Sequence, residues 1–219
     1  MTPVRHVVYL HGFASSPESS KATAFAQHLA ARGVSYACPD FNQPAFETLT
    51  VSRMLAQTAE AVAAAPAGPV ALIGSSLGAF VAVHAAQADR TGRVDRLILL
   101  APALDFGGNR LKQLGTQGID EWRRAGHLTV FHYAYGEPRD VGFALYEDAA
   151  AYDAMTADLR VPVLAFQGRR DELVDTRMVE RWAADRPSVT LHVVDDGHQL
   201  GESMPLIWRE SARFLGVAP

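Results

Sequence analysis

The segment Gly74-Ser75-Ser76-Leu77-Gly78 has the residue types and spacing of a sharp turn that exposes a serine hydroxyl. An apolar run of strand length precedes it and a helix-length run follows, which is the context that a Gly-x-Ser-x-Gly nucleophile turn requires. The glycines Gly74 and Gly78 fit because such a strained turn leaves little room for side chains. We therefore predict Ser76 as a nucleophile, with Ser75 at the variable position. The alternative is a plain glycine-rich turn with a helix-capping serine.

A nucleophilic serine needs a general base, and the base needs an acid that orients it. On an open α/β sheet these partners follow the serine in the order acid, then histidine, on loops after later strands. Asp171 lies just after the apolar run Val161–Gln167, and His198 lies just after Val189–Val194. Both are therefore expected at the carboxyl edge of the sheet, where such folds place their sites.

Each of these assignments has a competitor. Glu172 is the alternative acid, although Asp171 has the better position in its loop. His192 is the alternative base, but it lies inside a predicted strand. Five further histidines precede the acid loop and break the expected order: His6, His28, His84, His127 and His132.

Acyl transfer also needs donors for the developing oxyanion, usually two backbone N–H groups. The amide of Leu77 is one candidate, because it follows the nucleophile at a helix N-terminus. The other is the amide of Phe13 in His11-Gly12-Phe13, directly after the first predicted strand. Gly12 would let this loop approach a substrate closely, whereas a plain turn is the simpler interpretation of His11-Gly12 alone.

Strand-length and helix-length segments alternate along the chain, which predicts an α/β fold with an open, mostly parallel, doubly wound sheet. The expected strands are Val4–Leu10, Val34–Pro39, Val70–Ile73, Val94–Leu100, Val161–Gln167 and Val189–Val194. The expected helices are Lys21–Arg32, Glu47–Ala65, 77–88, Thr176–Ala184 and Ser203–Leu215. The segment 77–88 is apolar nearly all round, which predicts that it is buried against the sheet.

The alternation breaks between residues 105 and 150, where we predict a small cap inserted into a single domain that spans residues 1–219. Within it, Leu111–Arg124 is expected to be helical, Val130–Tyr135 to be a strand, and Gly136-Glu137-Pro138-Arg139 to be a turn. Its aromatic residues either line an acyl pocket or pack the cap onto the sheet: Trp122, Phe131, Tyr133, Tyr135, Phe143 and Tyr146.

Composition narrows the function classes. The chain has 219 residues, 48% of them hydrophobic, so it can bury a sizeable core. Its net charge of −4 and the absence of a lysine or arginine run argue against nucleic acid as a partner. No apolar run approaches the ~20 residues of a membrane span, and no signal peptide begins the chain, so a cytoplasmic location is expected.

Cysteine and histidine spacing give no sign of a metal or an organic cofactor. Cys38 is the only cysteine, which excludes an intrachain disulfide and CxxC motifs. His192 and His198 lack an accompanying HExxH motif. We therefore expect neither a metal nor a cofactor, while the oligomeric state stays undetermined by the sequence.

Several of these motifs together resemble a known family. The segments Val8-Tyr9-Leu10-His11-Gly12-Phe13 and Ser20-Lys21-Ala22, the turn around Ser76, and Gly197-His198 look like those of the small YqiA-type esterases. The resemblance covers nearly the whole chain except the cap. It implies an α/β-hydrolase fold and carboxylesterase activity, usually on short acyl chains, with Ser76, Asp171 and His198 as the triad.

The expected chemistry is hydrolysis of a small-molecule ester through an acyl-enzyme. A thioesterase, a lactonase or a perhydrolase would use the same triad, and a non-catalytic binding protein on this fold is the alternative of another class. Arg169 and Arg170, next to Asp171, either hold an anionic substrate tail or are simply solvated.

Overall fold

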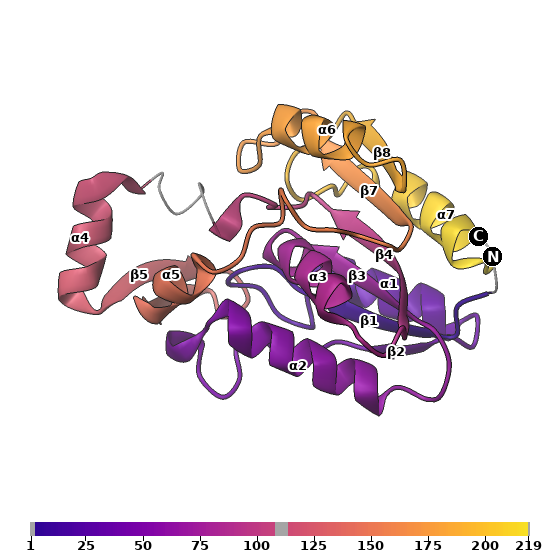
Figure 1. Cartoon of the computed structure of the whole chain (residues 1–219), viewed down its shortest axis with the longest axis horizontal. Helices are drawn as coiled ribbons and strands as arrows, with labels where there is room; N and C mark the ends of the chain where they lie inside the picture. The colour runs from indigo at the N-terminus through magenta and orange to yellow at the C-terminus, as the bar shows by residue number, and fades with distance from the viewer. Residues whose placement is uncertain (1–2, 108–113, 219) are drawn as a thin grey trace.

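A computed structural model describes residues 3–107 and 114–218, and its centre is a six-stranded, fully parallel sheet (Figure 1). The strands are β1 (His6–Leu10), β2 (Ser35–Ala37), β3 (Val70–Ser75), β4 (Val94–Leu100), β7 (Val163–Gly168) and β8 (Val189–Val194), in the spatial order β2-β1-β3-β4-β7-β8. After β1, the chain first adds β2 on one side of it and then adds β3 and the later strands on the other side. This reversal makes the sheet doubly wound, as the sequence predicted.

Helices cover both faces of the sheet. They are α1 (Ser20–Ala30), α2 (Val51–Ala64), α3 (Leu77–Ala88), α6 (Thr176–Ala184) and α7 (Met204–Leu215). Alternate residues of a strand point to opposite faces, so β1 sends Val7 and Tyr9 into the core with α1 and α7. Val8 and Leu10 enter the other core, with α2, α3 and α6. The three layers bury every residue of β1.

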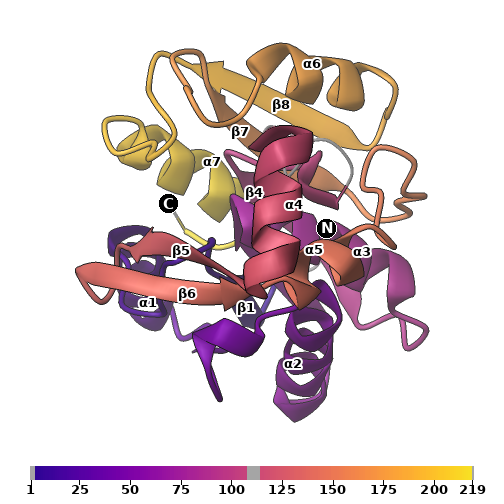
Figure 2. The same ribbon diagram turned by 90° about the vertical axis from the view of Figure 1, so that its left-hand side faces the viewer.

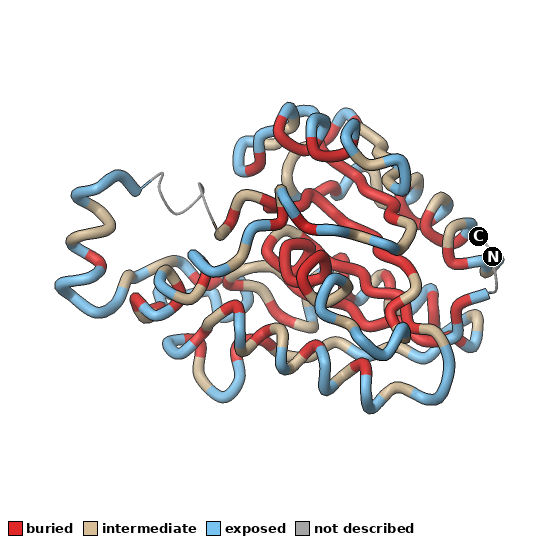
Figure 3. Tube along the Cα trace, in the orientation of Figure 1, coloured by how far each residue is buried: buried red, intermediate tan, exposed pale blue. Residues whose placement is uncertain are grey.

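Among the helices that cover the sheet, α3 is the most deeply buried, as its apolar composition predicts. All residues from Leu77 to His84 are buried, and the helix packs against β1, β3, β4 and α2. Figure 3 shows this burial as a continuous run through α3 and the neighbouring strands. Its N-terminus therefore has a fixed position at the carboxyl edge of the sheet.

One predicted helix is two elements. Glu47–Ala65 was expected to be continuous, but the structure has a short 3-10 turn, η1 (Phe46–Thr48), before α2 begins at Val51. The side chain of Thr50 accepts a hydrogen bond of 3.1 Å from the Arg53 amide. Thr50 is thus an N-cap with extended backbone, which is why the helix begins after it.

Between β4 and β7 the chain forms an insertion outside the sheet, which we define as the cap. It comprises α4 (Gly115–Ala125), the antiparallel hairpin β5 (His127–His132) and β6 (Glu137–Gly142), and α5 (Ala144–Ala149). Figure 1 shows it at the end of the molecule away from the two termini, and Figure 2 shows the hairpin and α4 face on. Residues 111–113 of the predicted helix lie outside the described residues.

Two predictions within the cap are wrong. The strand predicted at Val130–Tyr135 ends at His132, and the turn predicted from Gly136 to Arg139 lies at 133–136 instead. The turn closes where Gly136, with a φ of 70°, donates its amide to His132 O at 2.8 Å. Pro138 lies in β6 opposite Phe131, because a two-stranded ribbon consists of edge strands, which tolerate proline.

Candidate active site

Ser76 occupies a strained turn between β3 and α3. Its φ of 54° and ψ of −114° lie outside the regions that residues other than glycine normally adopt. Hydrogen bonds hold it there: its amide donates to Leu100 O at 2.9 Å, and its carbonyl accepts from Ala103 N at 3.3 Å. The next residue, Leu77, begins α3, so the turn places the serine at the helix N-terminus.

The two glycines of the motif are required by close backbone contacts. A Cβ on Gly74 would lie 2.4 Å from Gly78 O, and a Cβ on Gly78 would lie 2.0 Å from Leu10 O. Real Cβ atoms do not approach backbone this closely, so the turn excludes larger residues at both positions. The loop after β1 also comes close: a Cβ on Gly12 would lie 3.4 Å from the Ser76 Cβ.

The structure brings together the three side chains that the sequence predicted as a triad. His198 Nε2 lies 3.1 Å from Ser76 Oγ, and His198 Nδ1 lies 2.9 Å from Asp171 Oδ2. His198 follows β8 and Asp171 follows β7, so both reach Ser76 at the carboxyl edge of the sheet. This is the relay geometry in which a carboxylate orients an imidazole toward a hydroxyl.

Asp171 is held as a carboxylate by its own loop. Its side chain is fully buried, and Oδ1 accepts hydrogen bonds from Leu173 N at 2.8 Å and Val174 N at 2.9 Å. Gln167 Nε2 donates to Oδ2 at 3.0 Å. Burial alone would raise the pKa of Asp171, but the hydrogen bonds from His198 and the two amides outweigh it and lower the pKa. The acid is therefore ionised at neutral pH.

The competing residues lie elsewhere. Glu172 is exposed and forms no hydrogen bond to a residue that the structure describes. His192 stays within β8, where its ring stacks on Phe166 with centroids 5.2 Å apart. Among the described residues, neither forms a hydrogen bond or an ion pair with Ser76 or His198.

Two residues that line the cavity beside Ser76 have backbone amides without an acceptor among the described residues. Within the described residues, neither the Phe13 amide nor the Leu77 amide donates a hydrogen bond, and both residues line the same cavity as Ser76 and His198. Buried amides are normally paired, so two unpaired ones next to the predicted nucleophile are suited to bind a developing oxyanion.

His11 holds the loop that carries one of these amides. Its ring is 1% exposed, and Nε2 accepts a hydrogen bond of 2.9 Å from the Phe41 amide. Nδ1 lies 2.9 Å from Gly12 O and, because Nε2 is an acceptor, Nδ1 is the donor. His11 is thus saturated by backbone groups and fixes Gly12 and Phe13 in place.

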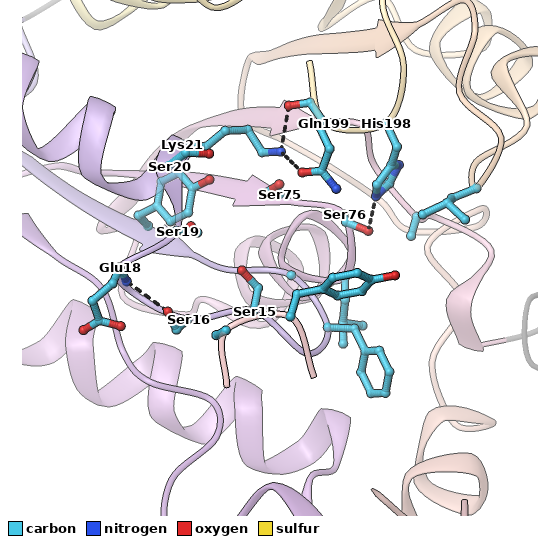
Figure 4. A pocket seen from close by; sticks show the side chains of 18 of the residues that line it. Ser15, Ser16, Glu18, Ser19, Ser20, Lys21, Ser75, Ser76, His198 and Gln199 are labelled. Carbon is cyan, nitrogen blue, oxygen red and sulfur yellow. Dashed lines mark hydrogen bonds between the residues drawn. The ribbon is translucent and has the colours of Figure 1, made fainter. Parts of the chain in front are cut away.

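Ser76 and His198 open into a cavity of about 700 Å³ with two chemically different arms (Figure 4). We call one the polar arm; it comprises Tyr9, Ser15, Ser16, Glu18, Ser19, Ser20, Lys21, Ser75 and Gln199. We call the other the apolar arm; it comprises Leu77, Ala103, Phe106, Val130, Phe131, Tyr133, Ala134 and Leu173. The labelled polar residues of Figure 4 lie to one side of Ser76 and His198.

The predicted cap aromatics divide between lining and packing. Phe131 and Tyr133 line the apolar arm. Trp122 is buried and donates from Nε1 to Val141 O at 3.1 Å, with Phe143 and Tyr146 packed against its ring. Tyr135 stacks on His132. Most of these rings therefore assemble the cap rather than meet a ligand.

None of the sequence motifs predicts the polar arm. Tyr9 and Lys21 occur only within the family-like segments, and Gln199 occurs in no motif. The serine-rich loop and the lysine after the first strand are the features that could indicate the polar arm, because a sheet of this type binds ligands where its winding reverses. The arginines considered for anion binding lie elsewhere: Arg169 and Arg170 are exposed, and Arg170 pairs with Asp195 at 3.2 Å.

Residues 3–107 and 114–218 contain no group of three or more His, Cys, Asp or Glu side chains placed to hold a metal ion. In the same part of the chain, no helix has both the length and the apolar character of a membrane span.

Comparison with known proteins finds a matching family and several similar structures. The model of the uncharacterised protein family UPF0227 matches residues 6–213. None of the curated proteins matches the sequence. A candidate hydrolase from Agrobacterium vitis is 26% identical with a TM-score of 0.83, over 96% of this chain and 87% of that one. A candidate α/β-superfamily hydrolase from Xanthomonas campestris is 27% identical with a TM-score of 0.67, over 96% and 98%.

A third solved structure extends the similarity of fold. Est1E from Butyrivibrio proteoclasticus, solved with ferulic acid bound, has a TM-score of 0.80 at 17% identity, over 97% of this chain and 88% of that one. The parallel sheet and its flanking helices are those of the α/β-hydrolase superfamily, as the sequence resemblance implied. Within that superfamily, the chain belongs to the uncharacterised protein family UPF0227.

Proposed function

We propose that this protein is a serine hydrolase that cleaves carboxylic esters through an acyl-enzyme intermediate. The observation that carries the proposal is the hydrogen-bonded series Asp171–His198–Ser76, which ends beside two unpaired amides in an open cavity. A nucleophile, an oriented base and an oxyanion site are the three parts that acyl transfer needs.

In the first step, Ser76 Oγ attacks the ester carbonyl carbon while His198 Nε2 takes the hydroxyl proton. The negative charge on the carbonyl oxygen is stabilised by the amides of Phe13 and Leu77, and α3 adds the positive end of its dipole. The carbon–oxygen bond to the alcohol then breaks, and His198 gives its proton to the departing alkoxide.

In the second step, water attacks the acyl-enzyme with His198 again as the base, and Ser76 leaves with the proton returned to Oγ. Asp171 accepts the Nδ1–H of His198 throughout. It fixes the tautomer that presents Nε2 to Ser76 and stabilises the imidazolium while it exists.

The apolar arm is suited to the acyl chain, because apolar side chains line it. Its outer part is formed by exposed cap residues, with Phe131 at 52% and Tyr133 at 76% exposure. A long chain would extend past them into solvent. Est1E, which shares the fold, has been solved with an aromatic acid bound, so this type of scaffold accommodates such ligands.

The decisive experiment compares the wild type with Ser76→Ala, using a fluorophosphonate probe and p-nitrophenyl esters from acetate to laurate. We expect the wild type to label and to hydrolyse the short esters, and Ser76→Ala to lose the label and at least about 10⁴-fold in kcat. Ser188→Ala, at an exposed serine before β8, is the matched control and should behave as the wild type.

The same assay separates the related chemistries. Butyryl thioesters, lactones and perhydrolysis in acetate with peroxide are measured in parallel, and the highest kcat/KM identifies the preferred acyl donor and acceptor. A folded wild type that neither labels nor turns over any acyl donor would overturn the proposal in favour of a binding protein on this fold.

A further inference from the structure

Lys21 is a buried cation without a counter-ion. Its side chain is 9% exposed, and Nζ donates to Gln199 O at 2.9 Å and to Gln199 Oε1 at 3.2 Å. Within the described residues it forms no ion pair with a carboxylate. Because a buried charge is costly unless it is paired, the side of the ammonium that faces the cavity lacks a partner.

The acidic groups around Lys21 are committed elsewhere. Asp196 accepts hydrogen bonds from Gly197 N at 2.7 Å and Ser203 N at 2.9 Å, and Asp171 is bound to His198 and its own loop. Burial lowers the pKa of Lys21 to about 8, although the charges of Asp196 and Asp171 oppose this. Glu18 lies exposed at the rim and has no hydrogen bond from Lys21.

Other donors in the polar arm also lack acceptors. Tyr9 is fully buried and lines the cavity, and its hydroxyl has no well-aligned hydrogen bond within the described residues, with the Ser75 side chain as the polar group that interacts with it. Helix α1 begins here without a side-chain cap, and the amides of Ser20 and Lys21 have no acceptor among the described residues. A helix N-terminus, an ammonium and a buried hydroxyl thus surround one end of the cavity.

We propose that the polar arm binds an anionic group, a carboxylate or a phosphate, on the alcohol part of the ester substrate, with Lys21 as its counter-ion. This inference rests on the proposed function, in which the acyl chain occupies the apolar arm. The alcohol is then directed to the opposite side of Ser76, toward Lys21. Lys21 is a specificity-determining residue in this assignment.

Gln199 connects Lys21 to the loop that carries His198. It is the residue directly after His198, and Lys21 binds both its carbonyl and its side chain. Loss of the lysine would therefore disturb the His198 loop as well as the anion site. The test must separate these two effects, so it compares substrates that differ only in charge.

The substrates are the butyryl esters of 3-hydroxypropanoate, of its neutral amide 3-hydroxypropanamide, and of 2-hydroxyethyl phosphate. The readout is the ratio of kcat/KM for each anionic ester to that for the amide ester. We expect the wild type to prefer one or both anionic esters by about tenfold or more, because a charge-assisted hydrogen bond replaces a neutral one. The better of the two identifies carboxylate or phosphate as the natural group.

Lys21→Met removes the charge and keeps the length of the side chain. We expect the ratio to fall to near one in this variant, whatever happens to the absolute rates. A residue that only anchored the His198 loop would lower the rates for all three esters in proportion and leave the ratio unchanged, which would overturn the proposal. A wild-type ratio near one would overturn it as well.

Two further variants keep the test informative if Lys21→Met does not fold. Tyr9→Phe removes only the unpaired hydroxyl and should lower the ratio a few-fold, whereas Glu18→Gln removes a rim charge and should raise it. An unchanged ratio in Tyr9→Phe together with a lower ratio in Glu18→Gln would contradict an anion site in this arm.

Direct binding separates failure of this inference from failure of the proposed function. Calorimetric titration of Ser76→Ala with 3-hydroxypropanoate and with 3-hydroxypropanamide needs no turnover. Binding of the acid but not the amide would support the anion site even if no ester is hydrolysed. Equal or absent binding of both would overturn it even if esters are hydrolysed.

Discussion

The carboxyl edge of the sheet and the cap contribute to the same cavity but are built differently. Around the edge, Ser76, Asp171 and His198 follow three separate strands and are fixed by backbone hydrogen bonds and by glycines that tolerate no Cβ. In the cap, Phe131 lies in β5 and Tyr133 in the turn that follows it, and both are more than half exposed. Close packing therefore specifies the positions of the proposed catalytic groups, while the proposed acyl-binding side is loosely specified.

This difference between the edge and the cap predicts where substitutions should be tolerated. A packed edge transmits a small displacement directly to the reacting atoms, because interiors have little room to relax. The cap is tied to the rest of the chain by few polar contacts, such as His132 Nε2 with Asn42 Oδ1 at 3.1 Å and Ser52 N with Asp148 Oδ2 at 2.8 Å. Its rings Phe131 and Tyr133, which line the cavity, are more than half exposed. We expect changes at the edge to act on chemistry and stability, and changes in the cap to act on substrate range.

The largest effect should come from Asp171→Asn. The amide keeps the shape of the carboxylate but favours the wrong tautomer of His198, so kcat should fall by about 10⁴-fold. Glu172→Gln changes the neighbouring exposed carboxylate in the same way and should leave kcat near the wild-type value. A similar loss in both variants would show that the loop, and not the Asp171 carboxylate, supports catalysis.

The next effect is on stability, from Gly78→Ala. Its Cβ would meet the Leu10 carbonyl oxygen at 2.0 Å, so we expect the free energy of unfolding to fall by about 3 kcal/mol or more. In the cap, Gly136→Ala meets nothing within 4 Å and suffers only from its φ of 70°, at about 1 kcal/mol. Urea denaturation measures both, and equal losses would contradict the contrast between edge and cap.

A pH effect should follow in the polar arm, which is built by loops of the sheet edge. As pH rises from 7 to 9, Lys21 passes through its pKa of about 8 and loses its charge. The preference for an anionic over an amide ester should therefore fall about tenfold over this range. Any effect of pH on the chemical step that the two esters share cancels in this ratio.

The other charged groups around Lys21 do not reverse this sign. Burial would raise the pKa of Asp171 and Asp196, but hydrogen bonds lower both, so these carboxylates stay ionised between pH 7 and 9. Burial raises the pKa of Tyr9 well above this range. A preference that increased with pH would contradict the role of Lys21 and of the polar arm.

The smallest effects should come from the apolar arm. Phe131→Ala and Tyr133→Ala remove exposed rings, so the free energy of unfolding should change by less than about 0.5 kcal/mol. For the longest p-nitrophenyl esters, kcat/KM should fall a few-fold, because less apolar surface covers the chain. Activity on p-nitrophenyl acetate is the internal control, and an equal fall there would place these rings in the catalytic machinery.

Much of the fold was predictable because its signals are local. The boundaries of β8 and α6 agree with the prediction, since apolar runs and capping residues lie next to one another in the chain. The cap was predicted less well. Its hairpin is short and half-exposed, so apolar periodicity carries little information there, and Pro138 was read as a turn residue although it pairs in β6.

The sequence by itself determined the chemistry that we propose for the edge. Gly74, Ser76 and Gly78 are adjacent in the chain, and the order of Asp171 and His198 follows from strands that must end at one edge. Only the tertiary structure decided what surrounds that chemistry. Tyr9, Lys21 and Gln199 come from β1, α1 and the loop after β8, respectively. No local pattern shows that Lys21 is a buried cation without a counter-ion among the described residues. Burial and pairing depend on which segments pack together, and so they become visible only once the chain is folded.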